Sequence, residues 1–184
     1  MSTPIQKKYA EEKFYFLLPI EKPVVPERIS AVAQEKGLYE KTECHVSLVV
    51  EKSAVKIREG LAKSGNPERV KAEILDLFNS LNFEYDLTND YSFQEKSYTR
   101  EELDERGLQD EPVHLRRSVV QVVDMPDVEI FYNKVSELLN IEIEIPVPHT
   151  TIFAWSDYEK KKDRGIGISS KKDFEMFSKD TIHI

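Results

Sequence analysis

The sequence predicts an α+β fold made of two similar lobes, and two observations support this prediction. Strand-like and helix-like hydrophobic patterns alternate along the chain. One order also occurs twice, namely an apolar strand, a helix that starts at proline, and a strand with a His-x-Ser/Thr pair, which indicates an internal duplication. We therefore expect a single domain over residues 1–184, with lobe one at about 14–81 and lobe two at about 82–184.

The first half begins with an apolar, aromatic-rich run at 14–20, which predicts a buried strand. Pro26 is well placed as a first helical residue and Gly37 as a stop, so 26–36 is expected to form a short helix. The run ECHVSLVVEK predicts the second strand. Helical periodicity follows over 53–81 and is interrupted by the sequence Ser-Gly-Asn-Pro.

The second half begins with alternating apolar and polar residues at 83–87, which predict a half-buried strand. A polar insert at 94–112 separates this strand from another at 113–123. Pro126 is expected to start a helix that ends near Asn140. The remaining predicted elements are a strand at 149–155, a lysine-rich loop with Gly-Ile-Gly at 165–167, a helix near 170–178, and TIHI as either a terminal strand or a frayed end.

Composition, cysteine count and net charge exclude several classes of protein. The 184 residues are 40% hydrophobic and 33% charged, as in globular domains with a core. The single Cys44 excludes an internal disulfide and cysteine-rich zinc spacings. The polar N-terminus lacks the apolar run of a signal peptide and no stretch could span a bilayer, so we expect a cytoplasmic protein without a membrane partner. A net charge of −8 argues against binding of long duplex nucleic acid.

Two strand-borne pairs, His45 with Ser47 and His149 with Thr151, are the candidates for chemistry. Side chains alternate between the faces of a strand, so each histidine shares the less apolar face with its hydroxyl neighbour. The pairs stand at matching places, 27 residues after the middle of one apolar strand and 29 after the middle of the other. Two lobes that face each other would bring both histidines into one cleft.

This combination of residues suits phosphate ester chemistry. One imidazole near neutral pKa can take a proton from an attacking hydroxyl or water while a second gives one to the departing oxygen. The Ser and Thr hydroxyls can donate hydrogen bonds to phosphate oxygens and stabilise the charge of the transition state. The mechanism needs no metal, and we expect no cofactor.

The motifs HVSL and HTTI, about a hundred residues apart, resemble those of the 2H phosphoesterase superfamily. The resemblance implies a bilobal fold with antiparallel-rich sheets, helices outside and the site in a central cleft. It also implies metal-free cleavage of 2′,3′-cyclic phosphates or 2′,5′ linkages in RNA ends or small nucleotides. His45 and His149 would be general acid and base, in an order that stays open, and Ser47 and Thr151 would hold the phosphate.

Four more residues are candidate substrate contacts. Arg116 and Arg117 are adjacent in a strand, so one of them should face the cleft and could clamp phosphate, unless both lie on a solvated surface. Phe153 and Trp155 continue the second motif face by alternation, and each could stack on a base or pack in the core. The neighbouring His114 is expected at the surface.

Other residues near the motifs are placed less firmly. Alternation puts Val49 and Glu51 on the face of His45. Tyr15 and Leu17 of the first strand are candidates for the cleft wall, but alternation alone does not decide their side. The loop 158–167 carries lysines and two glycines that could let backbone approach a phosphate, and it is equally typical of a solvated turn.

The insert at 94–112 carries seven acidic and three basic residues. Thr99 and Glu102 form a capping-box pattern, which predicts a short helix within it. If the insert covered the cleft, it would repel a long phosphate backbone and favour a small substrate. Deleting it would then change the preference for oligomer length.

Two classes of function are compatible with these residues. The first is a 2H-type phosphodiesterase, and the second is a binding module of the same fold that captures nucleotides or RNA ends without turnover. The sequence does not choose among RNA with a 2′,3′-cyclic end, a 2′,5′-oligonucleotide, an ADP-ribose cyclic phosphate and a cyclic dinucleotide.

Overall fold

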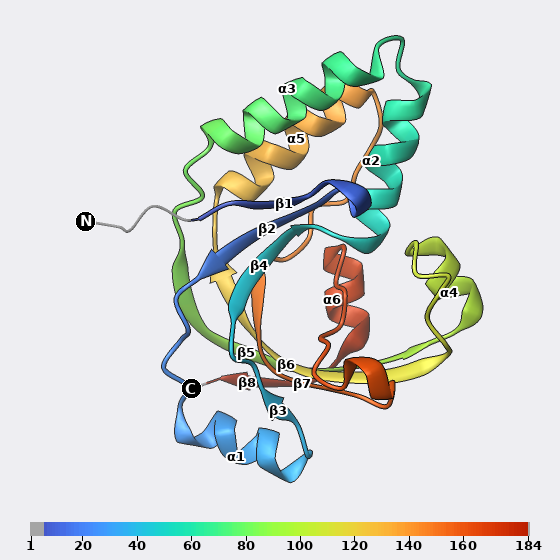
Figure 1. Ribbon diagram of the computed structural model, residues 1–184. Coiled ribbons are helices and arrows are strands. Elements are labelled where there is room, and N and C mark those ends of the chain that lie inside the picture. The colour runs from blue at the N-terminus through green and yellow to red at the C-terminus, as the bar shows by residue number, and fades with distance from the viewer. Residues whose placement is uncertain (1–5, 184) are drawn as a thin grey trace.

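The computed structural model describes residues 6–183, which form one eight-stranded antiparallel sheet with helices on both faces (Figure 1). The strands are β1 (Lys8–Ala10), β2 (Tyr15–Ile20), β3 (Tyr39–Glu40), β4 (Cys44–Val49), β5 (Asp86–Tyr98), β6 (His114–Asp124), β7 (His149–Ser156) and β8 (Ser178–His183). The helices are α1 (Glu27–Glu35), α2 (Glu51–Lys63), α3 (Pro67–Ser80), α4 (Arg100–Glu105), α5 (Asp127–Leu139) and α6 (Lys171–Phe177), with short 3-10 helices at Glu11–Lys13 and Glu159–Lys161. These elements confirm the α+β class.

The strand order is β1-β2-β4-β7-β6-β5-β8, with β3 paired to β7. β2 connects through α1 to β4, and β6 connects through α5 to β7, so the two motif strands become neighbours. Each crossover helix packs over the strands of the other connection, because Ile29 of α1 lies with Val119 and Phe153 while Phe131 of α5 lies against Phe16. The two regions predicted as lobes therefore share one continuous sheet.

The larger part of the core lies between α2, α3, α5 and the β2–β4 end of the sheet. Four fully buried phenylalanines meet there, and the rings of Phe16 and Phe78 are 4.7 Å apart at their centroids in an edge-to-face arrangement. The hydroxyl of Tyr132 donates to the backbone oxygen of Leu48 at 2.6 Å. This bond ties α5 to β4, so the core fixes the strand that carries the first histidine.

The predicted interruption of the helix at 53–81 is confirmed. The side chain of Asn66 accepts a hydrogen bond from the backbone N–H of Arg69 at 3.2 Å, and Pro67 is the first helical residue of α3. At the other end of the chain, the strand alternative for TIHI is the one that the structure describes, because Thr181 and Ile182 pair with β5.

The predicted strand at 83–87 is wrong in position. Phe83 has a φ of 54°, and its backbone N–H donates to Asp127 Oδ2 at 2.8 Å. The chain therefore turns at this phenylalanine, and β5 begins only at Asp86. The alternation of residue types does not indicate a strand here, because Phe83 is a turn residue whose ring is buried in the core beside the helices.

The boundary of the insert at 94–112 is also wrong, because β5 continues as far as Tyr98. Gln94 is fully buried within the sheet, and its amide donates to Ser92 Oγ at 2.8 Å. A polar residue that is buried inside a sheet resembles a surface residue when only the sequence is read. The capping box predicted at Thr99 is present and starts α4.

Candidate active site

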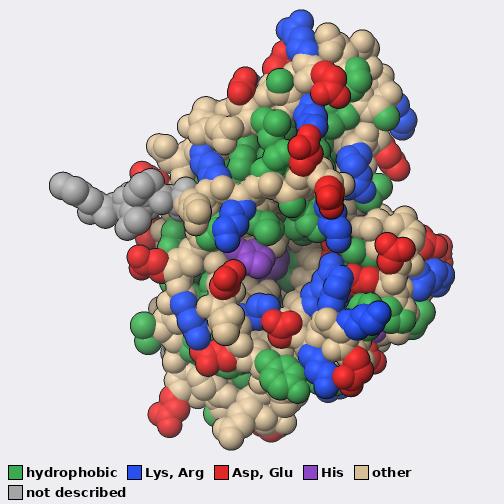
Figure 2. Space-filling view, in the orientation of Figure 1, with side chains coloured by type: hydrophobic (Ala, Val, Ile, Leu, Met, Phe, Trp, Pro, Cys, Tyr) green, Lys and Arg blue, Asp and Glu red, His purple; other side chains and the backbone are tan. Residues whose placement is uncertain are grey.

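The two His-x-Ser/Thr pairs lie side by side at the centre of the sheet. Val46 of β4 is directly opposite Thr150 of β7 in an antiparallel pairing. It follows that His45 stands opposite Thr151 and Ser47 opposite His149, with all four side chains on one face. Figure 2 shows histidine at the bottom of a hollow in the middle of the molecule, with Lys and Arg side chains around it.

Both motif strands contain a bulge directly after the hydroxyl residue. In β4 the register with β2 shifts after Ser47, and in β7 the register with β6 shifts after Thr151. Each bulge lets two successive residues turn toward the core, namely Leu48 with Val49 and Ile152 with Phe153. Bulges are frequent next to active sites because they redirect side chains.

The bulges correct three predicted side-chain positions. Val49 is fully buried in the core on the face away from His45. Phe153 packs against Ile29 of α1, and Trp155 lies on the same outer side, since its cross-strand neighbour is Arg117. Strict alternation therefore ends at the hydroxyl residues, and neither aromatic ring lines the hollow with the histidines.

His149 is held firmly. Its Nδ1 lies 2.7 Å from the backbone oxygen of Val147, so Nδ1 carries the proton and donates, which leaves Nε2 as the nitrogen that can accept a proton. The residue is 6% exposed and its ring contacts Phe174 of α6 at 6.3 Å between centroids. Burial lowers the pKa of His149, and a charge on nearby His45 would lower it further. The neutral imidazole is the favoured form.

His45 is half-buried and lies closer to solvent. Burial is the main cause that lowers its pKa, and the positive charges of Lys41 and Lys8 act in the same direction, while Glu43 opposes them. At neutral pH both histidines therefore favour the form that can accept a proton.

The two lysines beside His45 are site residues that sequence reasoning missed. Lys8 pairs with Leu17, and Leu17 pairs with Ser47, so Lys8 is on the motif face at two strand spacings, about 10 Å, from the serine. Lys41 approaches from the β3–β4 connection, where its Nζ lies 3.1 Å from Asp163 Oδ2. Strand register reveals the position of Lys8, which is 39 residues before Ser47 in sequence, and a backbone hydrogen bond from Lys41 to Ile152 of β7 fixes that of Lys41.

The same register places the first strand. Leu17 is opposite Ser47 and Pro19 is opposite His45, so both lie on the motif face. Tyr15 is half-buried, and burial raises its pKa, with the nearby Glu51 carboxylate acting in the same direction. Leu17 and Pro19 therefore lie beside the motif residues on the β2 side, whereas Tyr15 packs against the larger core.

The loop 157–170 reaches the site from the other side. A Cβ atom on Gly165 would lie 3.0 Å from Thr151 Oγ1, so the loop backbone is in contact with the motif threonine. The backbone N–H of Ile166 donates to Ser118 Oγ at 3.2 Å, which fixes the loop on β6. The sequence predicts no site residue in this loop, because two glycines near lysines are a weak signal.

The two arginines predicted as substrate contacts have protein partners. Arg116 is on the motif side of β6 but is fully buried, with its guanidinium 2.5 Å from Glu111 Oε2. Arg117 lies on the opposite side, where it pairs with Glu95 at 2.7 Å and covers the ring of Trp155 at 5.3 Å.

The prediction that His114 is a surface residue is wrong. His114 is 4% exposed, stacks on Tyr98 with 4.9 Å between centroids, and accepts from Arg116 Nε at 2.7 Å. Its Nδ1 donates to the backbone oxygen of Pro112. Buried in this way, His114 has a structural place behind the site.

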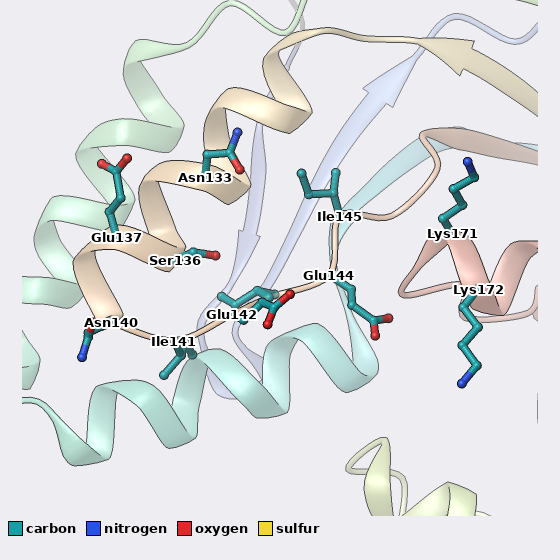
Figure 3. A pocket seen from close by; sticks show the side chains of 11 residues that line it. Asn133, Ser136, Glu137, Asn140, Ile141, Glu142, Glu144, Ile145, Lys171 and Lys172 are labelled. Atoms are coloured by element: carbon teal, nitrogen blue, oxygen red, sulfur yellow. The ribbon is translucent and has the colours of Figure 1, made fainter.

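Two cavities lie apart from the histidines. One of about 840 Å³ is lined by the C-terminal half of α5, the extended segment 141–145 and the first two lysines of α6 (Figure 3). The second, of about 290 Å³, lies between α2 and α6. None of the four motif residues lines either cavity.

The described residues 6–183 contain no group of three or more His, Cys, Asp or Glu side chains placed to hold a metal ion. Within the same residues, none of the helices combines the length and apolar character needed to cross a membrane. Comparisons with family models, with curated proteins and with solved structures gave no match to the chain.

Proposed function

We propose that this chain is a metal-independent phosphodiesterase of the 2H type. Its substrates would be 2′,3′-cyclic phosphates or 2′,5′ linkages of RNA ends or small nucleotides. The observation that carries the proposal is the placement of two His-hydroxyl pairs on one face of adjacent central strands, with each histidine opposite the other pair's hydroxyl. A phosphate on this face could contact both imidazoles and both hydroxyls.

The mechanism follows from this placement. One neutral imidazole takes the proton of the attacking hydroxyl or water, and the other, once protonated, gives its proton to the departing ester oxygen. Ser47 and Thr151 donate to the non-bridging oxygens, whose charge grows in the transition state. A bound phosphate anion favours the protonated form of a nearby imidazole, which supplies the acid although burial lowers both pKa values.

Three features support the proposal that the chain arose by internal duplication and consists of two similar lobes. The order strand, crossover helix and motif strand occurs twice, and the two motif strands are adjacent. A bulge follows the hydroxyl residue in each. Because a bulge is a property of the backbone, its recurrence at the same place is independent of the residue types that define the motif.

A cytoplasmic location is part of the proposal. The lone Cys44 is buried, and burial raises the pKa of its thiol, so it is an unreactive side chain that suits a reducing compartment.

The experiment is a product assay in EDTA with 2′,3′-cyclic nucleotides, 2′,5′-linked oligomers, an ADP-ribose cyclic phosphate and cyclic dinucleotides. We expect wild type to turn over one class and His45→Ala and His149→Ala to turn over none. Thr151→Val should lower this turnover, and Thr181→Val, at an exposed position of the edge strand β8, is its control. Binding of a nucleotide without turnover by wild type would contradict the enzyme and support the binding module.

A further inference from the structure

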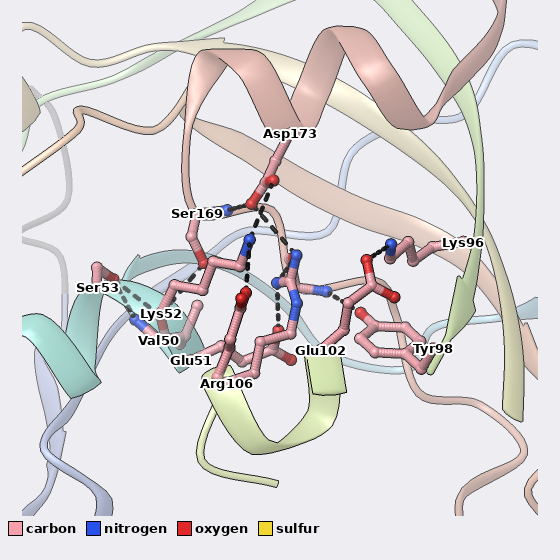
Figure 4. A network of polar contacts seen from close by, with 12 residues as sticks. Val50, Glu51, Lys52, Ser53, Lys96, Tyr98, Glu102, Arg106, Ser169 and Asp173 are labelled. Atoms are coloured by element: carbon pink, nitrogen blue, oxygen red, sulfur yellow. Dashed lines mark hydrogen bonds and ion pairs between the residues drawn. The ribbon is translucent and has the colours of Figure 1, made fainter. Parts of the chain in front are cut away.

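A buried ion cluster connects elements that are far apart in the sequence, and Figure 4 shows the part of it around Arg106, with Glu51 and Asp173. It joins the start of α2, the segment after α4, β6, the loop 157–170 and α6. Its members are Glu51, Arg106, Glu111, Arg116, Arg164 and Asp173.

Arg106 is the centre of one half of this cluster and is 1% exposed. Its Nη1 donates to Glu51 Oε2 at 2.8 Å and to the backbone oxygen of Gly167 at 2.7 Å. Its Nη2 donates to Asp173 Oδ2 at 3.3 Å. One guanidinium therefore connects the first residue of α2, two residues after the end of β4, to the loop that contacts Thr151.

Arg116 is the centre of the other half. It pairs with Glu111 at 2.5 Å, and its Nη1 donates to the backbone oxygen of Gly165 at 3.2 Å. Arg164 of the same loop also pairs with Glu111. Two buried arginines thus bind backbone oxygens of the Gly-Ile-Gly sequence, one at each glycine.

The two glycines fit tightly between the ion cluster and the motif. A Cβ atom on Gly167 would lie 1.9 Å from Glu51 Oε2, and one on Gly165 would lie 3.0 Å from Thr151 Oγ1. The loop is therefore in contact with the Glu51 carboxylate at Gly167 and with the Thr151 hydroxyl at Gly165. Movement of the loop would alter the space around Thr151.

The energetics of buried ion pairs indicate that the cluster positions the loop rather than adding to the stability of the fold. Burial removes water from the charges of the cluster, apart from the partly exposed Arg164, and buried ion pairs are often no more stabilising than apolar residues of the same size. A guanidinium does supply several donors in a fixed plane, which apolar residues cannot replace. The cluster therefore fixes geometry at the loop.

We propose that Arg106 is a positioning residue for the site, and that the segment between β5 and β6 which supplies it is an internal support of Thr151. The side chain reaches Gly167, and through the Gly-Ile-Gly backbone it sets the contact between Gly165 and Thr151. The effect on turnover rests on the proposed function, whereas the effect on the loop does not.

The first test is hydrogen exchange. The backbone N–H groups of Ile166 and Gly167 are bonded to Ser118 and Tyr98 side chains, so their exchange reports whether the loop is held. We expect Arg106→Met to speed their exchange by about tenfold or more while α3 amides are unchanged. Arg69→Met, at an exposed arginine of α3, is the matched control. Unchanged exchange at both amides would overturn the proposal.

The second test keeps the ion cluster intact. Gly165→Ala adds a methyl group against Thr151 and should lower kcat/KM for the cyclic or 2′,5′ ester by about tenfold. Gly65→Ala, where a Cβ meets no atom within 4 Å, is its control. Arg106→Lys, which cannot reach three acceptors at once, should give an intermediate loss.

The two proposals can fail separately. If wild type turns over no ester, the proposed function fails and exchange alone decides the role of Arg106. If wild type is active and Gly165→Ala matches it, the positioning role fails while the enzyme stands. If Arg106→Met does not fold, Gly165→Ala still decides the role of the loop.

Discussion

His45 and His149 carry the same motif in different surroundings. His45 is half-buried between Lys8 and Lys41, and the structure gives its ring no hydrogen-bond partner among the described residues. His149 is buried, bonded through Nδ1 to Val147, and covered by α6. The difference indicates that burial, together with the surrounding charges, sets the pKa of His45, whereas a fixed hydrogen bond also holds the ring of His149.

The largest expected effect comes from replacing either motif histidine, which is the feature that the two pairs share. His45→Gln and His149→Gln should each lower kcat by about 10²–10⁴-fold, the usual contribution of a general acid or base. Single-turnover rates with a 2′,3′-cyclic nucleotide measure both losses. Full loss in one variant and none in the other would mean that the two histidines do not act together.

The second prediction tests the bulge on β7. Phe153→Ala should destabilise the fold by about 3–5 kcal/mol, because it empties a core site against α1. Trp155→Ala, two residues on and half-buried, should cost clearly less. Urea unfolding of both variants measures the difference. If Phe153→Ala left stability intact and weakened only substrate binding, its ring would belong to the site.

The third prediction uses the buried imidazole. The pKa of His149 is lowered in the folded state, so the unfolded chain binds more protons below pH 6.5. The neutral His149 contributes fully to the free energy of unfolding above the unfolded-state pKa of about 6.5. As the pH falls from the unfolded-state pKa to the lower folded-state pKa, this contribution decreases by about 1.4 kcal/mol for each pH unit. Urea unfolding at pH 7.5 and 5.5 should show a smaller acid loss in His149→Gln than in wild type. Equal losses in both proteins would contradict this burial effect.

The smallest expected effect concerns His45 alone. Lys8→Ala removes a nearby positive charge, so the pKa of His45 should rise, and only slightly, because the lysine is exposed and water screens its charge. NMR titration of the histidine ring protons measures it, and added salt should shrink the difference. Lys134→Ala, on an exposed part of α5, is the control. A larger shift at His149 than at His45 would reverse the comparison.

The sequence predicts the features that local patterns encode. The motif strands, the helix breaks at proline and the capping box are each determined by neighbouring residues, and the structure contains them. The pairing of His45 with Thr151 across two strands was expected only in outline, as two histidines meeting in one cleft.

Local sequence patterns do not encode strand register, β-bulges or the burial of charged side chains. Phe153 was assigned to the wrong face because a bulge leaves no fixed residue signature. Lys8 and Arg106 resemble ordinary surface cations in the sequence, and only the pairing of distant strands places one beside the site and the other inside the molecule.

The central claim is that both His-hydroxyl pairs bind one phosphate group. NMR titration with inorganic phosphate, following both histidine rings, tests it most directly. We predict that the pKa values of His45 and His149 rise together and saturate with the same dissociation constant, and that Thr151→Val weakens both responses. Shifts at only one histidine, or two different dissociation constants, would contradict a single shared site.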